Sequence, residues 1–253
     1  MTRIGVLPAL VTLGNGYCGL LAIYKTADGE FYTASWLIML AMGFDALDGK
    51  IARIAGVTSK FGGYLDSLSD ALSFGVAPAF LVKEVLQKDY PGKLLVLLTA
   101  IFALGALLRL ARYNVEHSMG EGLDKDEGEV DSFDGIPTPG AAGIIASLVF
   151  LAEDSSALTN YKVVLMTLPF LCVILGCLMI SRVRYIHFGH RFLKGRREFT
   201  YLFKLVMIGI LVTKFPHETL AIAFVAYGIA GPFLRRRVQP DEPLPQPQVT
   251  ERS

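Results

Sequence analysis

The sequence predicts an all-α fold, namely a polytopic bundle of transmembrane helices. Hydrophobic residues make up 53% of the 253 residues, above the roughly 45–50% that is typical of soluble domains, and the mean hydropathy is +0.48. Apolar runs of membrane-spanning length recur along the chain, and most of the loops between them are short. The net charge of +1 provides no bulk attraction for nucleic acid, and we expect no nucleic-acid partner.

Eight segments are candidate spans, because a spanning helix needs about 20 mostly apolar residues. The fifth and seventh are short, which leaves six or seven spans as alternatives. The eight segments run from Leu7 to Tyr24, Phe31 to Arg53, Phe61 to Leu86, Leu94 to Tyr113, Pro137 to Ala152, Tyr161 to Ser181, Thr200 to Thr213 and Glu218 to Leu234.

The first apolar segment has one early positive charge and no small-residue cleavage site after it. We therefore expect a first spanning helix and no cleavable signal peptide. The three cysteines, Cys18, Cys172 and Cys177, lie within apolar runs. We expect them to be small buried side chains and to form no disulfide framework.

Lysine and arginine concentrate in a subset of the loops. If the chain has eight spans, an even number, these loops and both termini lie on the same side of the membrane. Cytoplasmic loops are the basic ones, so we expect both termini in the cytoplasm of a multi-pass protein of the inner membrane. The basic positions are Arg53, Lys60, Arg109, Arg112, Arg182, Arg184, Arg191, Lys194, Arg196, Arg197, Arg235, Arg236 and Arg237.

Two polar segments interrupt or follow the apolar ones. Residues 116–134 are acidic and contain little to bury, and we expect a solvated loop or lid on the cytoplasmic side. Residues 238–253 contain several prolines and glutamines, and we expect a disordered cytoplasmic tail. Residues 1–237 would then form a single integral-membrane domain.

The segment from Phe44 to Gly75 holds the most informative pattern, four aspartates inside apolar helices. An ionised side chain within a span costs roughly 3 kcal/mol on insertion scales, which makes it a candidate functional group. Asp45 and Asp48 are three residues apart, and Asp66 and Asp70 are four apart. Each pair therefore shares one face of a helix, and we expect two carboxylate stripes that face each other.

Four carboxylates without histidine or cysteine form a hard-oxygen site, which suits magnesium, manganese or calcium better than zinc. Two divalent ions would neutralise them, and paired metals clamp a phosphoryl centre. Arg53 would add a planar fork for a diphosphate, and the membrane setting implies a lipid substrate. The alternatives are pairing with Lys50, Arg53 and Lys60, which cannot all face one stripe, or the ion pathway of a divalent-cation transporter.

These positions together are similar to the complete signature of the CDP-alcohol phosphotransferases, D45-x2-D48-G49-x2-A52-R53-x8-G62-x3-D66-x3-D70. The resemblance implies a helical membrane enzyme with a six-helix catalytic core and two further helices. It would transfer a phosphatidyl-type group from a CDP-linked lipid to an alcohol and release CMP, with two Mg or Mn ions, as a homodimer.

The resemblance also implies roles for individual residues. The aspartates Asp45, Asp48, Asp66 and Asp70 would hold the metals, and Asp70 would also be the general base. The groups implied to contact the nucleotide and its diphosphate are Gly49, Ala52, Arg53, Gly62 and a hydroxyl at Thr58 or Ser59. Asn15, which is alone in the first apolar segment, would hydrogen-bond either the nucleotide or another helix.

The stretches LPALVTLGNGYCGL, LLRLARYNVE, FDGIPTPGAAG and, more weakly, SRVRYIHFGH resemble the phosphatidylserine synthase branch of this family. That branch implies CDP-diacylglycerol as donor and L-serine as acceptor. Glycerol 3-phosphate or inositol phosphate as acceptor, or an archaeal-type ether lipid as donor, are alternatives.

L-Serine is a zwitterion, and its carboxylate needs a cation. Arg109 and Arg112 are three residues apart at the cytoplasmic end of the fourth segment, with Asn114 as a neutral partner. Their alternative role is to anchor the helix at the membrane surface. Pro137 and Pro139 would begin the fifth helix, and the resemblance implies that they shape the acceptor pocket.

Overall fold

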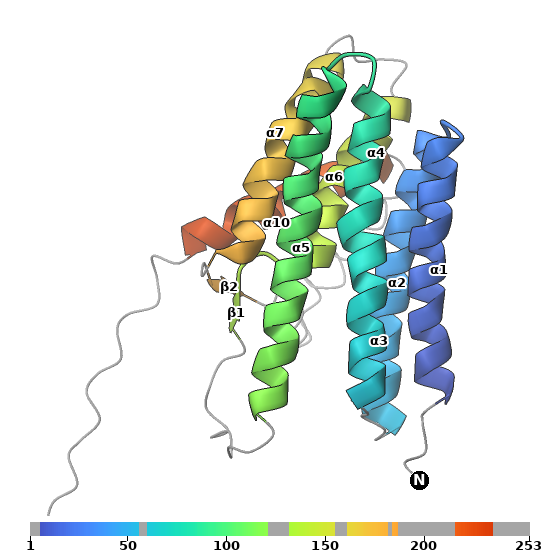
Figure 1. Ribbon diagram of the computed structural model, residues 1–253, viewed down its shortest axis with the longest axis vertical. Helices are drawn as coiled ribbons and strands as arrows, with labels where there is room; N and C mark the ends of the chain where they lie inside the picture. The colour runs from blue at the N-terminus through green and yellow to red at the C-terminus, as the bar shows by residue number, and fades with distance from the viewer. Residues whose placement is uncertain are drawn as a thin grey trace, which may run out of the picture.

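The computed structural model describes residues 6–55, 60–120, 132–154, 161–181, 184–186 and 216–234. Long helices dominate these ranges (Figure 1). They are α1 (Val6–Ala27), α2 (Phe31–Ala55), α3 (Lys60–Asp70), the π-helical η1 (Ala71–Val76), α4 (Ala77–Leu86), α5 (Gly92–Gly120), α6 (Thr138–Asp154), α7 (Tyr161–Ile180) and α10 (Pro216–Leu234). Helices α3, η1 and α4 follow one another without a break and form one rod.

Seven of the eight predicted segments are helical in the structure, and the segment from Thr200 to Thr213 lies outside the described residues. By length and composition, the helices Lys60–Leu86 and Gly92–Glu116 are long and apolar enough to cross a membrane. The predicted all-helical bundle is therefore confirmed for the described part of the chain, with one small exception.

The exception is a pair of three-residue strands, β1 (Ser132–Asp134) and β2 (Arg184–Ile186). They are antiparallel, and Phe133 pairs with Tyr185. The prediction that residues 116–134 form only a loop was wrong at both ends. Helix α5 continues to Gly120, and β1 occupies the last three residues of that segment.

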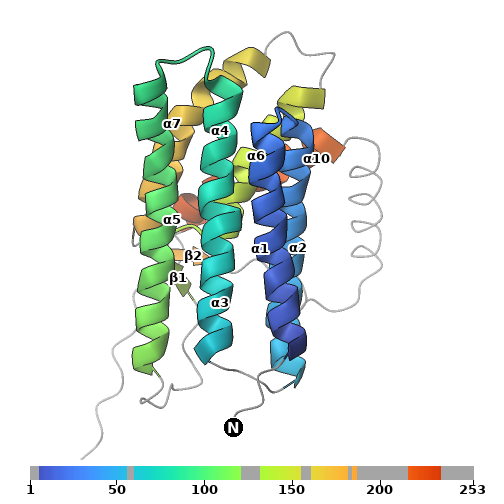
Figure 2. The ribbon, with the colours of Figure 1, turned by 45° about the vertical axis from the view of Figure 1, so that its right-hand side comes forward.

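The rod formed by α3, η1 and α4 stands between α1 and α5 (Figure 2). Helices α1 and α2 are joined by a turn in which Gly29 has a φ of 79°. Gly29 N–H donates to the Thr26 carbonyl over 3.1 Å, and Glu30 N–H donates to the Lys25 carbonyl over 2.9 Å. This is the Schellman arrangement, in which a glycine in the left-handed region closes a helix, so α2 turns back against α1.

Two further pairs of helices approach closely where one of them carries a glycine. A Cβ atom built on Gly105 of α5 would lie 2.7 Å from the Gly176 carbonyl oxygen of α7. Gly140 of α6 likewise faces the ring of Tyr227 in α10. A Cβ atom built on Gly140 would lie 2.7 Å from Cε1 of that ring. Because these positions lack side chains, α5 can pack against α7 and α6 against α10.

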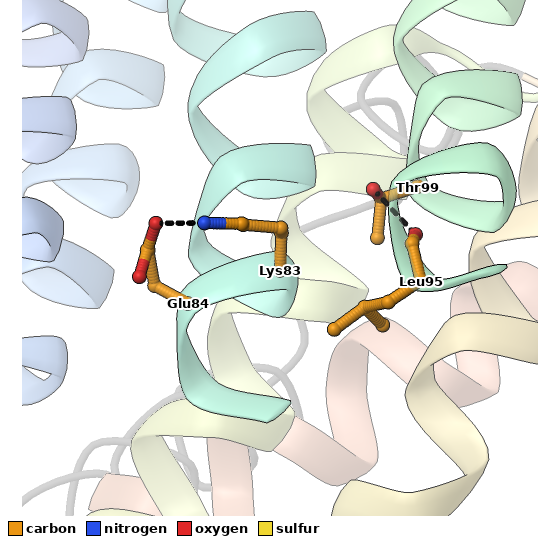
Figure 3. A network of polar contacts seen from close by, with 4 residues as sticks. All are labelled: Lys83, Glu84, Leu95 and Thr99. Carbon is orange, nitrogen blue, oxygen red and sulfur yellow. Dashed lines mark hydrogen bonds and ion pairs between the residues drawn. The ribbon is translucent and has the colours of Figure 1, made fainter. Parts of the chain in front are cut away.

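Polar groups on the apolar helices find partners close by (Figure 3). Lys83 forms an ion pair with its neighbour Glu84 in α4. The buried Thr99 hydroxyl donates to the Leu95 carbonyl in α5 over 2.9 Å. Such local pairing lowers the cost of placing polar groups in an apolar layer.

The three cysteines are free. Cys18 and Cys172 are buried, as expected, but Cys177 is exposed. The burial prediction was wrong for Cys177, because an apolar run alone does not show which face of α7 packs against other helices.

Candidate active site

Three of the four predicted aspartates converge in the structure. Helix α2 carries Asp45 and Asp48, and α3 carries Asp66. One carboxylate oxygen from each of the three lies within 4.8 Å of the other two. The i, i+3 spacing places both α2 carboxylates on one face, and the tertiary fold brings Asp66 opposite them.

The chemistry of this triad suits a divalent cation. Asp48 Oδ2 and Asp66 Oδ1 are buried and have no hydrogen-bond partner in the described part of the chain. A buried carboxylate oxygen without a partner is costly. Carboxylate oxygens are also the ligands that Mg²⁺ and Mn²⁺ prefer. The triad can therefore hold a metal ion.

Asp70 lies one turn beyond Asp66 and outside the triad. It is buried, and its Oδ1 accepts a hydrogen bond from Asn15 Nδ2 over 2.8 Å. The helix changes to π geometry directly after it, at Ala71, and single π turns are frequent at functional sites. Within this turn, Ser73 Oγ donates to the Asn15 backbone carbonyl over 2.9 Å.

Helix α1 supplies polar groups to both carboxylate-bearing helices. Asn15 contacts Asp70, so the contact that the structure shows is the helix–helix one of its two expected roles. Thr12, one turn earlier, lies beside the Asp48 carboxylate, while its hydroxyl donates to the Pro8 carbonyl over 3.0 Å. Thr12 is not among the residues that the sequence predicts for the site, although its spacing of three residues from Asn15 in an apolar helix is a usable signal.

The predicted nucleotide-binding residues are only partly described. Gly49 is exposed, and a Cβ built on it would have no described neighbour within 4 Å. Gly62 lies one turn before Asp66 on α3. Ala52 and Arg53 belong to the end of α2, but their side chains lie outside the described part, as do Thr58 and Ser59 altogether. The roles of these residues stay predictions.

The two predicted acceptor arginines point to different partners. Arg109 Nη1 donates to Thr138 Oγ1 at the start of α6 over 3.3 Å, and its Nε is buried without a partner among the described residues. Arg109 is also near enough to Asp70 for their charges to interact. Arg112 Nη1 instead donates to the Ile180 carbonyl at the end of α7 over 3.1 Å.

The other predicted acceptor residues lie on α5 and at the start of α6. Asn114 Oδ1 accepts a hydrogen bond from Ser67 Oγ over 3.0 Å, which ties α5 to α3 between Asp66 and Asp70. Pro137 directly precedes α6, and its carbonyl accepts from Ala141 N–H over 3.0 Å. Pro139 lies in the first turn of α6, where the missing N–H of proline is tolerated.

The turn before α6 is set by Gly135. Its φ is +85°, and a Cβ atom there would lie 3.0 Å from the carbonyl oxygens of both Leu178 and Ser181 at the end of α7. Only glycine combines this backbone conformation with so close an approach. The FDGIPTPG stretch is therefore held against the α7 terminus, which positions Thr138 beside Arg109.

The chain is similar to known proteins over most of its length. The family model for CDP-alcohol phosphatidyltransferase matches residues 5–178. The chain is 33% identical over 225 residues to the CDP-diacylglycerol–serine O-phosphatidyltransferase of Helicobacter pylori, with 88% of each chain covered. It is 34% identical over 190 residues to the archaetidylserine synthase of Methanothermobacter thermautotrophicus, with 73% of this chain and 71% of the relative covered.

Among solved structures, the apo phosphatidylinositol phosphate synthase of Mycobacterium tuberculosis matches 69% of this chain and 87% of its own, with a TM-score of 0.49 and 21% identity. The family match covers the described site helices from α1 to α7 almost completely, including the aspartate triad, Asp70 and Arg109. On this basis the chain belongs to the CDP-alcohol phosphatidyltransferase family.

Proposed function

We propose that the chain transfers the phosphatidyl group of CDP-diacylglycerol to the hydroxyl of L-serine, which yields phosphatidylserine and CMP for phospholipid biosynthesis. The observation that carries this proposal is the convergence of Asp45, Asp48 and Asp66, with Asp70 one turn away and near the guanidinium of Arg109. The names of the relatives from Helicobacter pylori and Methanothermobacter thermautotrophicus support serine as the acceptor.

The four aspartates would hold Mg²⁺ or Mn²⁺, and we propose two ions. When bound, the metal withdraws charge from the diphosphate and makes CMP a better leaving group. None of the described residues comes within 4 Å of a Cβ atom built on Gly49, which leaves room for the nucleotide beside the triad. Further contacts with the nucleotide and diphosphate are proposed for Ala52, Arg53, Thr58, Ser59 and Gly62.

Asp70 is the proposed general base. Its carboxylate accepts the proton of the serine hydroxyl while the hydroxyl oxygen attacks the phosphorus that carries the diacylglycerol. The bond from that phosphorus to the bridging oxygen breaks, and CMP leaves with this oxygen. The products are phosphatidylserine, CMP and one proton. Because the chain has to position both substrates, orientation and electrostatics supply most of the catalysis.

The acceptor pocket is proposed to lie between α3, α5 and α6. Arg109 would bind the serine carboxylate there, with Asn114, Pro137 and Pro139 around it. Arg112 contributes by holding the end of α7. A phosphorylated acceptor such as glycerol 3-phosphate or inositol phosphate carries a dianion and would require more basic side chains at this place.

We also propose the finer topology. The chain would cross the inner membrane eight times and place both termini and the opening of the active site in the cytoplasm. Residues 1–237 would form the membrane domain, and residues 238–253 the tail. The family resemblance further suggests a homodimer. The proposed topology is supported by Arg109 and Arg112, two basic residues in the second half of α5, and by the two helices whose length and composition suit a membrane span.

The test is CMP release by purified protein with CDP-diacylglycerol, Mn²⁺ and a panel of acceptors. We expect release that depends on L-serine. Release with only glycerol 3-phosphate or only inositol phosphate would contradict the proposed acceptor. An ether-linked CDP lipid in a parallel assay identifies the preferred donor. Divalent-cation flux through proteoliposomes without any CMP release would identify a transporter instead.

A further inference from the structure

Two residues that interact with Asp70 each carry a buried polar atom without a partner among the described residues. Asn15 is fully buried, and its Oδ1 has no hydrogen-bond partner in the described part of the chain. Arg109 Nε is likewise buried and unpartnered there. Asn15 contacts Asp70 directly, and Arg109 interacts with it through charge. One unpartnered acceptor atom and one unpartnered donor atom thus belong to the two residues that interact with the proposed base.

The orientation of the Asn15 amide follows from its contact. The Asn15 NH₂ group donates to Asp70, so the amide oxygen, which can only accept, is turned away from that contact. The Ser73 hydroxyl donates to the Asn15 backbone carbonyl over 2.9 Å, and Gly19, one turn further along α1, lies directly against Ser73. These contacts fix α1 against η1 beside Asp70, and Asn15 Oδ1 is left without a partner among the described residues.

Leaving a buried acceptor unsatisfied is unfavourable, so the natural partner of Asn15 Oδ1 is a donor that arrives with a substrate. Resting on the proposed function, we propose that Asn15 belongs to the acceptor subsite: its Oδ1 accepts a hydrogen bond from the α-ammonium group of an amino acid whose carboxylate binds Arg109. The ligand class is thus a zwitterionic β-hydroxy amino acid, and Asn15 is a specificity-determining residue.

The proposed ligand carries the two groups that Asn15 and Asp70 would bind close together. The ammonium and hydroxyl groups of serine are on neighbouring carbons. The Asn15 amide similarly places its oxygen beside the NH₂ group that contacts Asp70. A ligand whose ammonium group meets Asn15 Oδ1 therefore brings its hydroxyl toward the Asp70 carboxylate. An acceptor that carries a phosphate and no ammonium group leaves Asn15 Oδ1 unpaired, which disfavours it.

The experiment compares kcat/KM for three acceptors. L-Serine has all three groups, 3-hydroxypropanoate lacks the ammonium group, and ethanolamine lacks the carboxylate. We expect the wild-type protein to prefer serine over each analogue by roughly 10- to 100-fold, as a hydrogen bond to a charged group allows. If the wild type releases CMP with serine but does not distinguish it from 3-hydroxypropanoate, the inference is wrong and the proposed function stands. If serine gives no CMP release, the proposed function itself fails.

Variants separate the two contacts. Asn15→Leu is nearly isosteric, and we expect it to reduce the preference for serine over 3-hydroxypropanoate by about tenfold or more, with the preference over ethanolamine retained. Arg109→Gln should instead reduce the preference for serine over ethanolamine and retain the preference over 3-hydroxypropanoate. Asn15→Asp keeps an oxygen for the ammonium group but removes the donor to Asp70, so kcat should fall for all acceptors while the preference for the ammonium group remains.

The matched control is Ser35→Ala in α2, ten residues before Asp45. It removes another buried oxygen that has no partner among the described residues. The preferences for serine over 3-hydroxypropanoate and over ethanolamine should both stay at the wild-type values. A raised KM for CDP-diacylglycerol in Asn15→Leu with an unchanged acceptor preference would instead make Asn15 a nucleotide ligand. Thermal unfolding in detergent reports whether each variant folds. If Asn15→Leu does not fold, the wild-type comparison of the three acceptors still decides the inference.

Discussion

Gly19 of α1 and Ser73 of η1 lie in direct contact, and a Cβ atom on Gly19 would come within 2.6 Å of the Ser73 Cα atom. Four residues earlier, the Asn15 backbone carbonyl accepts a hydrogen bond from the Ser73 hydroxyl, and the Asn15 side-chain NH₂ group donates one to Asp70. The π turn that begins after Asp70 carries Ser73. The close approach at Gly19 and the contact to the proposed base therefore belong to one helix–helix interface.

Gly19→Ala should disrupt this interface. The added methyl group meets backbone, which cannot move aside as a flexible side chain can, and overpacking of this kind costs about 1–3 kcal/mol. We expect a lower unfolding temperature in detergent and a large loss of CMP release. Gly92→Ala at the open start of α5 is the control, since a Cβ there has no described neighbour within 4 Å. Equal stability of the two variants would contradict the packing that the structure shows.

Removal of divalent metal should abolish CMP release. EDTA-treated protein is expected to be inactive and to recover with Mg²⁺ or Mn²⁺. Asp45→Asn and Asp66→Asn should each raise the Mn²⁺ concentration needed for half-maximal activity by tenfold or more, because each removes a charged ligand oxygen from the triad (about 1.4 kcal/mol per factor of ten). Asp28→Asn, in the exposed turn before α2, should leave the Mn²⁺ requirement unchanged. An unchanged requirement in both triad variants would argue against this metal site.

Asp70→Asn should stop turnover while binding of CDP-diacylglycerol survives. The amide nearly matches the shape of the carboxylate, but it cannot accept the hydroxyl proton, and general-base catalysis contributes typically 10²–10⁴-fold. Titration of the lipid nucleotide into the purified variant with Mn²⁺ present measures binding, and CMP release measures turnover. Turnover within a few-fold of the wild type would remove Asp70 as the base.

The two arginines of α5 should respond differently to substitution. Arg109→Gln removes the proposed carboxylate partner and should raise the KM for serine. Arg112→Gln removes the hydrogen bond to the Ile180 carbonyl and should lower the unfolding free energy by about 1–2 kcal/mol with a smaller effect on that KM. Unfolding in detergent and serine titrations of both variants provide the comparison. A larger KM effect in Arg112→Gln would place the serine carboxylate at Arg112.

Reporter fusions test the proposed topology. Alkaline phosphatase fused after Asp89, in the turn between α4 and α5, should be active, because this enzyme folds only outside the cytoplasm. A fusion at Ser253 should be inactive, and a fluorescent protein fused there should fluoresce. Active phosphatase at the C-terminus would exclude an even number of spans with a cytoplasmic N-terminus.

Local patterns in the sequence determined the helices, since apolar length and i, i+3 or i, i+4 spacing depend only on residues that are near one another along the chain. They also placed Asp45 and Asp48 on one face, and the signature of the aspartates indicated the family that the comparisons confirm. Span count, topology and the role of each site residue stay predictions.

The tertiary structure decided which groups from different helices meet. Asn15 and Asp70 are 55 residues apart, and nothing in their local spacing shows that the amide faces this carboxylate. Arg109 and Arg112 carry the same charge and lie one turn apart on the same helix. Arg109 nevertheless contacts α6, and Arg112 contacts the end of α7. A helix places such neighbours about 60° apart around its axis, so only the packing of the surrounding helices directs one arginine to the proposed site and the other to a helix end.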